Sequence, residues 1–470
     1  MRKVDVAIIG AGSAGLSARR EVAKKTDNWV VIDNGILGTT CARVGCMPSK
    51  VLIQSAYDFS RKEKFEEQGI FGGENLRVDT SLTMKHVRKL RDRFVRGVSS
   101  GMESWVSDER LIRKKATFID KNTLDLEGEK IWAKEIIIAT GSKPVVPEQF
   151  DDFKDFIITT DEFFEQETLQ ENIAVVGLGV IGIELGQSLH KLGLNVLGIA
   201  RREIIAGVSD PEIRAYVVRK LSEQMNLSFK GIQKLERVGD QLKITTGDKE
   251  FLADKVLMTA GRKPVLNTLN LEVLDLEVDK RSIPLHSKTT FQITSAPNIY
   301  LPGDVNGDKP ILHEASDEGK IAGYNAVREE KIDFQTRTPL AVTFSEPNIA
   351  SAGLVYDQLQ SMGVDFQEGK VLFEGQGRSI VKLKEIGMLK VYGETKSGKI
   401  LGAEMFGPDT EHIAHLMAWV IQMKMTVNQV LSLPFYHPVI EEGLRTSLRD
   451  LRSKVEETSP DLEIYPCEPQ

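Results

Sequence analysis

The stretch VDVAIIGAGSAG, residues 4–15, decides the fold of the N-terminal part of the chain. Its apolar run ends in the turn GAGSAG, and an Ala-, Arg- and Glu-rich stretch of helical character follows. This order of buried strand, glycine turn and helix is typical of a Rossmann unit. Gly10, Gly12 and Gly15 would let the backbone turn tightly and approach a pyrophosphate, whose charge is met by N–H groups at the start of the helix.

The same pattern returns in the middle of the chain. The apolar run 173–176 leads into GLGVIG, which contains Gly177, Gly179 and Gly182, and then into the amphipathic stretch IELGQSLHKLG. A single GxGxxG is weak support for a dinucleotide site, but two copies that each follow a strand and precede a helix are strong support. The sequence therefore predicts two dinucleotide-binding units.

The residues after the second strand of each unit predict different ligands. In the first unit Asp33 ends the strand WVVID, where a carboxylate would accept hydrogen bonds from ribose hydroxyls. The second unit has Ala200, Arg201 and Arg202 at this place. Guanidinium groups suit a 2′-phosphate, so the sequence favours NADPH over NADH, with solvated surface charges as the alternative.

Composition and charge exclude several classes of protein. A formal charge of -7 leaves no basic excess for nucleic acid, and no apolar run is long enough to span a bilayer. The 3 cysteines of the 470 residues cannot form a secreted disulfide framework, so we expect a cytoplasmic protein with reduced thiols. Residues 459–470, which include Cys467, are expected to form a loosely held tail with an exposed bystander cysteine.

The other two cysteines lie close together in LGTTCARVGCMPSK, residues 37–50. On an ideal helix, Cα atoms five residues apart are ~8–9 Å from each other, whereas a disulfide needs less than ~7 Å. If Cys41 and Cys46 bond, the helix must be distorted, and Gly45 and Pro48 would permit this. A strained bond is easily reduced, which favours a redox pair over a structural one. A metal site would need further Cys or His ligands, and the segment contains none.

A cycling thiol pair also needs a base, because the thiolate is the nucleophile. Of the 7 histidines, His437 in YHPVIEE is the best candidate, since Glu442 is close enough in sequence to bond its far ring nitrogen. The alternative is a packed histidine with no catalytic role.

In this order, the motifs GAGSAG, CARVGCMPSK, ATGSKP, GLGVIGIELG, TAGRKP, LPGDV and HPVIEE resemble the class I pyridine nucleotide-disulfide oxidoreductases. Within that family the dihydrolipoamide dehydrogenases are the most similar. The resemblance covers essentially the whole chain. It implies an α/β fold with two Rossmann-like dinucleotide-binding domains, for FAD and NAD(P), and a C-terminal α+β dimerisation domain. The implied boundaries are 1–145 and 266–336 for the FAD and central parts, 146–265 for the NAD(P) domain and 337–470 for the interface domain.

The resemblance also implies roles for individual residues. Cys46 would be the sulfur next to the flavin, Cys41 the sulfur that meets the substrate, His437 the acid/base and Glu442 the residue that orients it. Because the family places the histidine of one subunit beside the cysteines of the other, a homodimer is implied. The remaining residues implied to bind the cofactors are Lys50 near the flavin with Glu184 as its ion-pair partner, Asp304 at the ribityl chain, Thr140 and Gly141 at the flavin, and Thr40, Ala116 and Gly261.

Four positions depart from the dihydrolipoamide dehydrogenase pattern: Thr39 for glycine, Arg43 for asparagine, Val439 for threonine, and Ala200 for the ribose carboxylate. Arg43 is expected to lower a thiol pKa or to meet an anionic substrate. An NADPH-dependent reductase of another small disulfide, similar to glutathione reductase, therefore remains the main alternative, and a non-enzymatic redox sensor is a second one. The dithiol or disulfide substrate is either a small molecule or a lipoyl group on another protein. Mercuric reductases are also similar but carry a pair of cysteines in the tail, where this chain has only Cys467.

Overall fold

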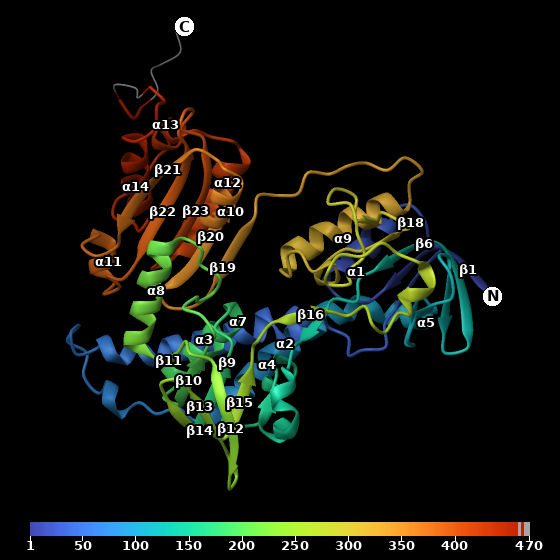
Figure 1. Cartoon of the computed structure of the whole chain (residues 1–470), viewed down its shortest axis with the longest axis horizontal. Coiled ribbons are helices and arrows are strands. Elements are labelled where there is room, and N and C mark those ends of the chain that lie inside the picture. Colours follow the sequence, from blue (N-terminus) through green and yellow to red (C-terminus); the bar gives the residue numbers. More distant parts are fainter. Residues whose placement is uncertain (459–461, 465–470) are drawn as a thin grey trace.

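The computed structural model describes residues 1–458 and 462–464, which form three α/β units (Figure 1). The N-terminal unit contains an eight-stranded sheet whose main path has the order β17-β18-β6-β1-β2-β3. The strands β2 and β6 flank β1 and run parallel to it, and β18 runs parallel to β6. Their bounds are β1 Arg2–Ile9, β2 Trp29–Ile32, β3 Leu111–Ile112, β4 Thr117–Phe118, β5 Thr123–Leu126, β6 Glu129–Ile138, β17 Gln292–Ile293 and β18 Ala296–Tyr300.

Two helices of this unit, α1 (Ser13–Val22) and α9 (Leu312–Ala326), pack against each other at very close range. A Cβ atom added at Gly319 would lie 2.2 Å from the carbonyl oxygen of Ala14, so only glycine fits there. This contact joins the N-terminal glycine turn to a helix far along the chain. Between β2 and β3 the chain forms α2 Thr40–Val44, α3 Cys46–Ser60, α4 Thr80–Ser99 and α5 Glu103–Ser107. Of these, α2, α3 and α4 share a hydrophobic core with β9 (Asn172–Val176) and α7 (Val180–Lys191) of the second unit (Figure 1).

The second unit is a parallel five-stranded sheet of order β11-β10-β9-β15-β8 with a three-stranded antiparallel sheet, β12-β13-β14, beside it. The parallel strands are short and almost wholly apolar, as expected for strands buried on both faces. The bounds are β8 Ile157–Ile158, α6 Thr160–Phe163, β9 Asn172–Val176, α7 Val180–Lys191, β10 Asn195–Ile199, α8 Pro211–Gln224, β11 Asn226–Ser228, β12 Ile232–Val238, β13 Gln241–Thr246, β14 Glu250–Ala253 and β15 Lys255–Met258.

The chain enters and leaves this second unit through two paired strands, β7 (Ser142–Pro144) and β16 (Arg262–Pro264). Arg262 reinforces the pair, because its Nη2 donates to the carbonyl oxygen of Ser142 at 2.7 Å. The second unit is therefore an insertion in the first.

The C-terminal unit is an antiparallel sheet of order β19-β20-β23-β22-β21 with helices packed on it. An extended segment after α9 crosses from the N-terminal unit to this sheet (Figure 1). The bounds are β19 Leu340–Thr343, β20 Asn348–Gly353, α10 Tyr356–Ser361, β21 Phe366–Leu372, α11 Gly377–Val381, β22 Met388–Glu394, β23 Ile400–Gly407, α12 Thr410–Gln422, α13 Val427–Leu431 and α14 Glu442–Arg452.

Part of the expected loose tail is firmly bound. The carboxylate of Glu463 lies 2.9 Å from Arg445, 2.8 Å from Arg449 and 2.9 Å from Arg452, all on α14. These three guanidinium groups lower the pKa of Glu463 to about 2. The expectation of a loose tail is wrong at this residue, because sequence alone does not reveal that Glu463 lies against the three arginines of α14; Cys467 lies outside the described residues.

The three units confirm the predicted fold class of two parallel α/β units and a C-terminal α+β unit. In the part of the chain that the structure describes, no helix combines the length and the apolar character needed to cross a bilayer.

Candidate active site

The N-terminal glycine turn has the shape that a dinucleotide needs. Cβ atoms at Gly10 and Gly15 would come within 2.3 Å of Ala139 O and 2.0 Å of Gly10 O, whereas Gly12 has no neighbour within 4 Å of its Cβ position. The outer glycines thus allow tight packing of strand and helix, and the middle one leaves the backbone open to a ligand. These residues fit a bound pyrophosphate.

The second glycine turn repeats this geometry. Added Cβ atoms would lie 2.4 Å from Thr259 O at Gly177 and 1.8 Å from Gly177 O at Gly182, while Gly179 again faces open space. The two turns are equivalent although their sequences share little beyond the glycines. The second unit therefore also fits a dinucleotide.

Asp33 directly follows β2 and forms a hydrogen bond with the first glycine turn. Its Oδ2 accepts a hydrogen bond from the backbone N–H of Ala11 at 2.6 Å, and its Oδ1 accepts one from Gly35 at 2.7 Å. The carboxylate is therefore fixed at the strand end where a ribose would bind.

The other residues expected at the first cofactor site surround the ends of β6 and β18. Asp304 begins a short 3₁₀ helix and accepts a hydrogen bond from Ser142 Oγ at 2.7 Å. Thr140 Oγ1 donates to Val265 O at 2.6 Å, and Gly141 has a positive φ of 68° that favours glycine. Of the remaining predicted residues, Ala116 is buried in the core of the first unit, Thr40 is the first residue of α2, and Gly261 has a φ of 112° in the segment before β16.

The two cysteines lie on either side of a break between helices. Cys41 is in α2, Cys46 is the first residue of α3, and between them Gly45 has φ -128° and ψ -118°, outside the helical region. This is the helix distortion that a bond between Cys41 and Cys46 would require. Both are free thiols in this structure, Cys46 the more exposed, and they lie close enough for each to shift the pKa of the other.

The two thiols differ in acidity. Interaction with the Cys41 thiol, helped by the ammonium of Lys50, lowers the pKa of Cys46 to about 7 against the opposing effect of desolvation. The pKa of Cys41 is raised, first by its interaction with Cys46 and then by burial. The negative charge of the reduced pair therefore resides on Cys46. The main charges that act on Cys46 belong to Lys50 and Glu184, so the expectation that Arg43 lowers a thiol pKa is not supported.

Lys50 and Glu184 form an ion pair between α3 and α7, with 2.8 Å from Nζ to Oε2. Glu184 is almost fully buried, and Lys50 is one-third exposed. Two residues that sequence reasoning did not single out complete this cluster. The centroid of the Phe344 ring lies 4.6 Å from Lys50 Nζ. The side chain of Gln187 forms hydrogen bonds with the backbone of Glu346, two residues after Phe344.

His437 and Glu442 meet as expected, with 3.0 Å from Nδ1 to Oε1. The hydrogen bond to His437 lowers the pKa of Glu442. The pair lies between α13 and α14, where the carbonyl oxygen of Val439 accepts a hydrogen bond at 2.8 Å from Gln376 Nε2, just before α11. Among the described residues of this single chain, no hydrogen bond joins His437 to either cysteine.

Arg201 and Arg202 follow β10 and are both exposed. No ion pair to either is found within the described ranges, so their guanidinium groups are available to a ligand. Arg43, in contrast, has its Nε buried without a hydrogen-bond partner there.

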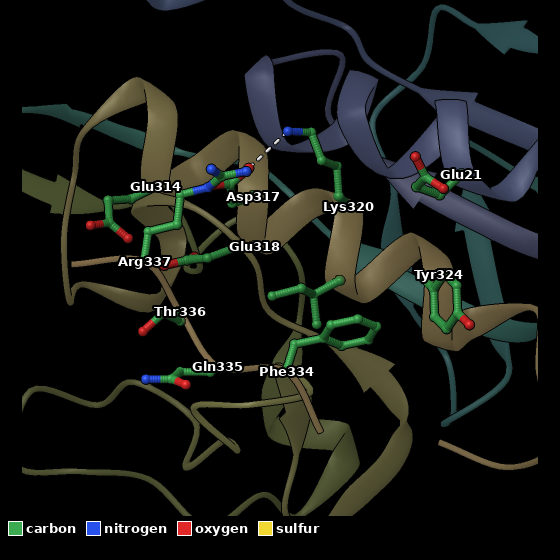
Figure 2. A pocket seen from close by; sticks show the side chains of 11 residues that line it. Glu21, Glu314, Asp317, Glu318, Lys320, Tyr324, Phe334, Gln335, Thr336 and Arg337 are labelled. Atoms are coloured by element: carbon green, nitrogen blue, oxygen red, sulfur yellow. Dashed lines mark hydrogen bonds and ion pairs between the residues drawn. The ribbon is translucent and has the colours of Figure 1, made fainter. Parts of the chain in front are cut away.

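A cavity of about 270 Å³ lies apart from all these residues, between α9 and the segment 334–337 (Figure 2). Among its lining residues, Asp317 pairs with Lys320 at 2.8 Å and with Arg337 at 2.6 Å. None of the predicted site residues lines it.

Comparisons with known proteins agree with this geometry. Residues 4–319 match the family model described as pyridine nucleotide-disulphide oxidoreductase, and residues 340–448 match the dimerisation domain of the same family. The chain belongs to the pyridine nucleotide-disulphide oxidoreductases, flavoproteins that bind FAD and a pyridine nucleotide and act on sulfur groups.

Individual relatives differ in their activities. The chain is 29% identical to a dihydrolipoyl dehydrogenase of Haloferax volcanii, over 94% of both chains. It is 28% identical to a mercuric reductase of Staphylococcus aureus, over 94% of this chain and 81% of that protein. Among solved structures, LpdA from Mycobacterium tuberculosis has a TM-score of 0.81 at 21% identity, and the flavoprotein disulfide reductase RclA from Escherichia coli has 0.79 at 21%; both alignments cover 96% of this chain and 99% of the other. At this identity the structural likeness concerns the fold.

Proposed function

We propose that the protein is a dihydrolipoamide dehydrogenase-like oxidoreductase that passes electrons between a dithiol or disulfide substrate and NAD(P) through FAD and the Cys41–Cys46 pair. The observation that carries this proposal is the placement of the two free thiols, Cys41 and Cys46, on either side of the α2–α3 break, with Lys50 one helical turn further along α3. A binding protein has no need for a thiol of lowered pKa beside a protonated partner.

The residues of the chain have distinct tasks. The two glycine turns bind the pyrophosphates, and Asp33 binds the adenosine ribose of FAD. Lys50, Thr140, Gly141 and Asp304 hold the flavin. When bound, FAD and the nicotinamide cofactor supply the hydride and electron transfer.

The thiol pair divides the sulfur chemistry between its members. Cys46 holds the thiolate of the reduced pair, next to the ammonium of Lys50. Cys41 keeps its proton, so it needs a base before it can attack a substrate disulfide. The proton of Cys41 would pass to His437, which returns it to the departing substrate sulfur, and Glu442 holds the imidazole in position.

A homodimer would supply that base, because His437 of one subunit would meet the cysteines of the other. The match to a dimerisation domain supports this arrangement. So do the large apolar side chains exposed on and after α12, namely Trp419, Met423 and Tyr436. The protein would act in the cytoplasm, where its thiols stay reduced.

Arg201 and Arg202 support NADPH as the preferred nucleotide, since an exposed guanidinium pair follows β10 in place of a ribose-binding carboxylate. The combination of NADPH with a small disulfide such as glutathione disulfide is therefore the second candidate. A lipoyl group on another protein and a small disulfide are the substrate classes to compare.

Steady-state rates with NADH and NADPH, each against lipoamide and glutathione disulfide, test the proposal. We expect turnover with lipoamide, and we expect Cys41→Ser to abolish disulfide reduction while electron transfer to an artificial dye continues. Preference for glutathione disulfide would replace the first candidate with the second. If Cys41→Ser reduced disulfides as fast as the wild-type protein does, both candidate functions would be overturned.

A further inference from the structure

The ammonium of Lys50 is held by groups from two other units. Glu184 on α7 forms an ion pair with it, with 2.8 Å between Oε2 and Nζ. The ring of Phe344, just after β19, has its centroid 4.6 Å from Nζ. An ammonium within about 6 Å of a ring centroid is attracted by the electron-rich face of the ring. Lys50 therefore has an aromatic contact from the C-terminal unit as well as an ion pair with the second unit.

Phe344 also binds the other half of the ion pair. Its backbone N–H donates to Glu184 Oε1 at 2.9 Å, while the second carboxylate oxygen, Oε2, takes Lys50. Glu184 thus bridges Lys50 and Phe344, and the three residues form a closed triangle of contacts. Each contact limits the freedom of the other two.

The turn that carries Phe344 is fixed to α7. Gln187 Nε2 donates to Glu346 O at 2.8 Å, and Gln187 Oε1 accepts from Glu346 N at 2.7 Å. A reciprocal pair of this kind sets both the position and the orientation of the backbone. The ring of Phe344 therefore has a defined place relative to the start of α3.

The position of the Lys50 ammonium matters for Cys46. The two residues are four apart on α3, so their side chains lie on the same face of the helix. The charged and titratable groups that act on Cys46 are Cys41, Lys50 and Glu184. Lys50 has a flexible four-carbon stem and is one-third exposed, so without a second contact its ammonium could move into solvent.

We propose that Phe344 is a positioning residue for Lys50: its ring and backbone N–H fix the Lys50–Glu184 pair so that the ammonium faces Cys46. The C-terminal unit, which also carries His437, thereby sets the charge beside the thiolate. The proposal rests on the assignment of Cys46 as a redox thiol. It adds a residue of the C-terminal unit that acts on the thiolate through Lys50.

The test follows the titration of Cys46 in the FAD-loaded protein, in a Cys41→Ser/Cys467→Ser background where Cys46 is the single cysteine. The readout is the ultraviolet absorbance of the thiolate as a function of pH, after subtraction of the absorbance of the matching Cys46→Ser protein. We expect Phe344→Leu to raise the midpoint by about half a pH unit, which is about a threefold smaller ratio of thiolate to thiol near the midpoint. Phe344→Tyr and Phe344→Trp keep an aromatic face and should leave the midpoint in place.

Phe366→Leu is the matched control, because this partly buried phenylalanine packs on Tyr356 and Tyr392 in the same unit. It should not change the midpoint. In a Lys50→Met background, Phe344→Leu should produce no further shift. An unchanged midpoint in folded Phe344→Leu, an equal shift in Phe366→Leu, or a full shift without Lys50 would each overturn the proposal. The titration needs no substrate turnover, so it fails or succeeds independently of the activity assays.

Discussion

Asp210 and Lys390 form a buried ion pair between the second and C-terminal units, with 3.0 Å between Oδ2 and Nζ. Asp210 also accepts from Tyr392 OH, and its Oδ1 caps α8 through the N–H groups of Glu212 and Ile213. Beside it, Glu404 accepts from the backbone N–H of Ser209 at 2.8 Å. The segment that begins with Arg201 and Arg202 is therefore attached, at Ser209 and Asp210, to the sheet of the C-terminal unit.

Lys390→Met should be strongly destabilising, because it leaves the buried carboxylate of Asp210 without its cation. We expect a loss of about 3–5 kcal/mol, measured by urea unfolding. Lys370→Met is the matched control, since Lys370 pairs with Glu212 at 2.8 Å on the surface and should cost less than about 1 kcal/mol. Adding Asp210→Asn to Lys390→Met should restore much of the stability, as asparagine can still cap α8. Equal losses for the two lysine variants would contradict this account.

Thr39→Gly should stabilise the protein. Thr39 has φ 60° and ψ 150°, a conformation found almost only in glycine, and it precedes the helix that carries Cys41. Its side chain caps α2 by accepting from Ala42 N at 3.2 Å, which offsets part of the strain. We expect a net gain of about 1 kcal/mol in urea unfolding for Thr39→Gly. Thr39→Ala loses the cap and keeps the strain, so it should destabilise. No gain in stability for Thr39→Gly would show that the backbone is not strained.

Glu318→Gln should change how stability depends on pH. Burial raises the pKa of Glu318 to about 7, although Gly303 and Asn306 donate hydrogen bonds to it. The folded state then binds the proton more tightly than the unfolded state, so stability falls as pH rises from about 4 to about 7. Glutamine keeps an acceptor oxygen without the charge. We expect it to be more stable than the wild type by up to about 3 kcal/mol at pH 8, with little advantage at low pH. The same difference at pH 5 and pH 8 would refute this.

His437→Gln should slow disulfide turnover by about 10²–10⁴-fold, the usual contribution of a general acid/base. Electron transfer from the nucleotide to a dye should be unchanged, because the histidine acts only on the sulfur side. Glu442→Gln should give a smaller loss, since it disturbs the 3.0 Å contact with the ring but leaves the imidazole. Mixed dimers of His437→Gln and Cys41→Ser subunits should recover one functional site in each heterodimer. No recovery would contradict the shared site.

Arg201→Ala/Arg202→Ala should lower kcat/KM for NADPH by about 10–100-fold, the loss expected for hydrogen bonds to a charged group. The value for NADH should stay the same, because NADH has no 2′-phosphate. Lys234→Ala/Arg237→Ala, which removes two exposed cations of the same unit from β12, is the control for general charge effects. An equal loss with both nucleotides would assign the arginines a different role.

The predictable features of this protein are local in sequence. A strand, a glycine turn and a helix follow one another within each dinucleotide unit, and a break near Gly45 is expected if the two neighbouring cysteines bond. The contacts that sequence reasoning missed join distant segments: Phe344 and Glu184 are 160 residues apart, and Lys390 and Asp210 are 180 apart. No periodicity pairs such residues. Lys50 and Glu184, 134 apart, could be paired only through the resemblance to a family.

The attachment of Glu463 to α14 bears on how the protein should be produced. Shortened chains that end before this residue would expose three guanidinium groups on the helix that begins at Glu442, and their mutual repulsion would strain the neighbourhood of His437. An affinity tag therefore belongs at the amino end. The carboxy-terminal stretch should be kept, because one of its side chains is the counter-ion of that helix.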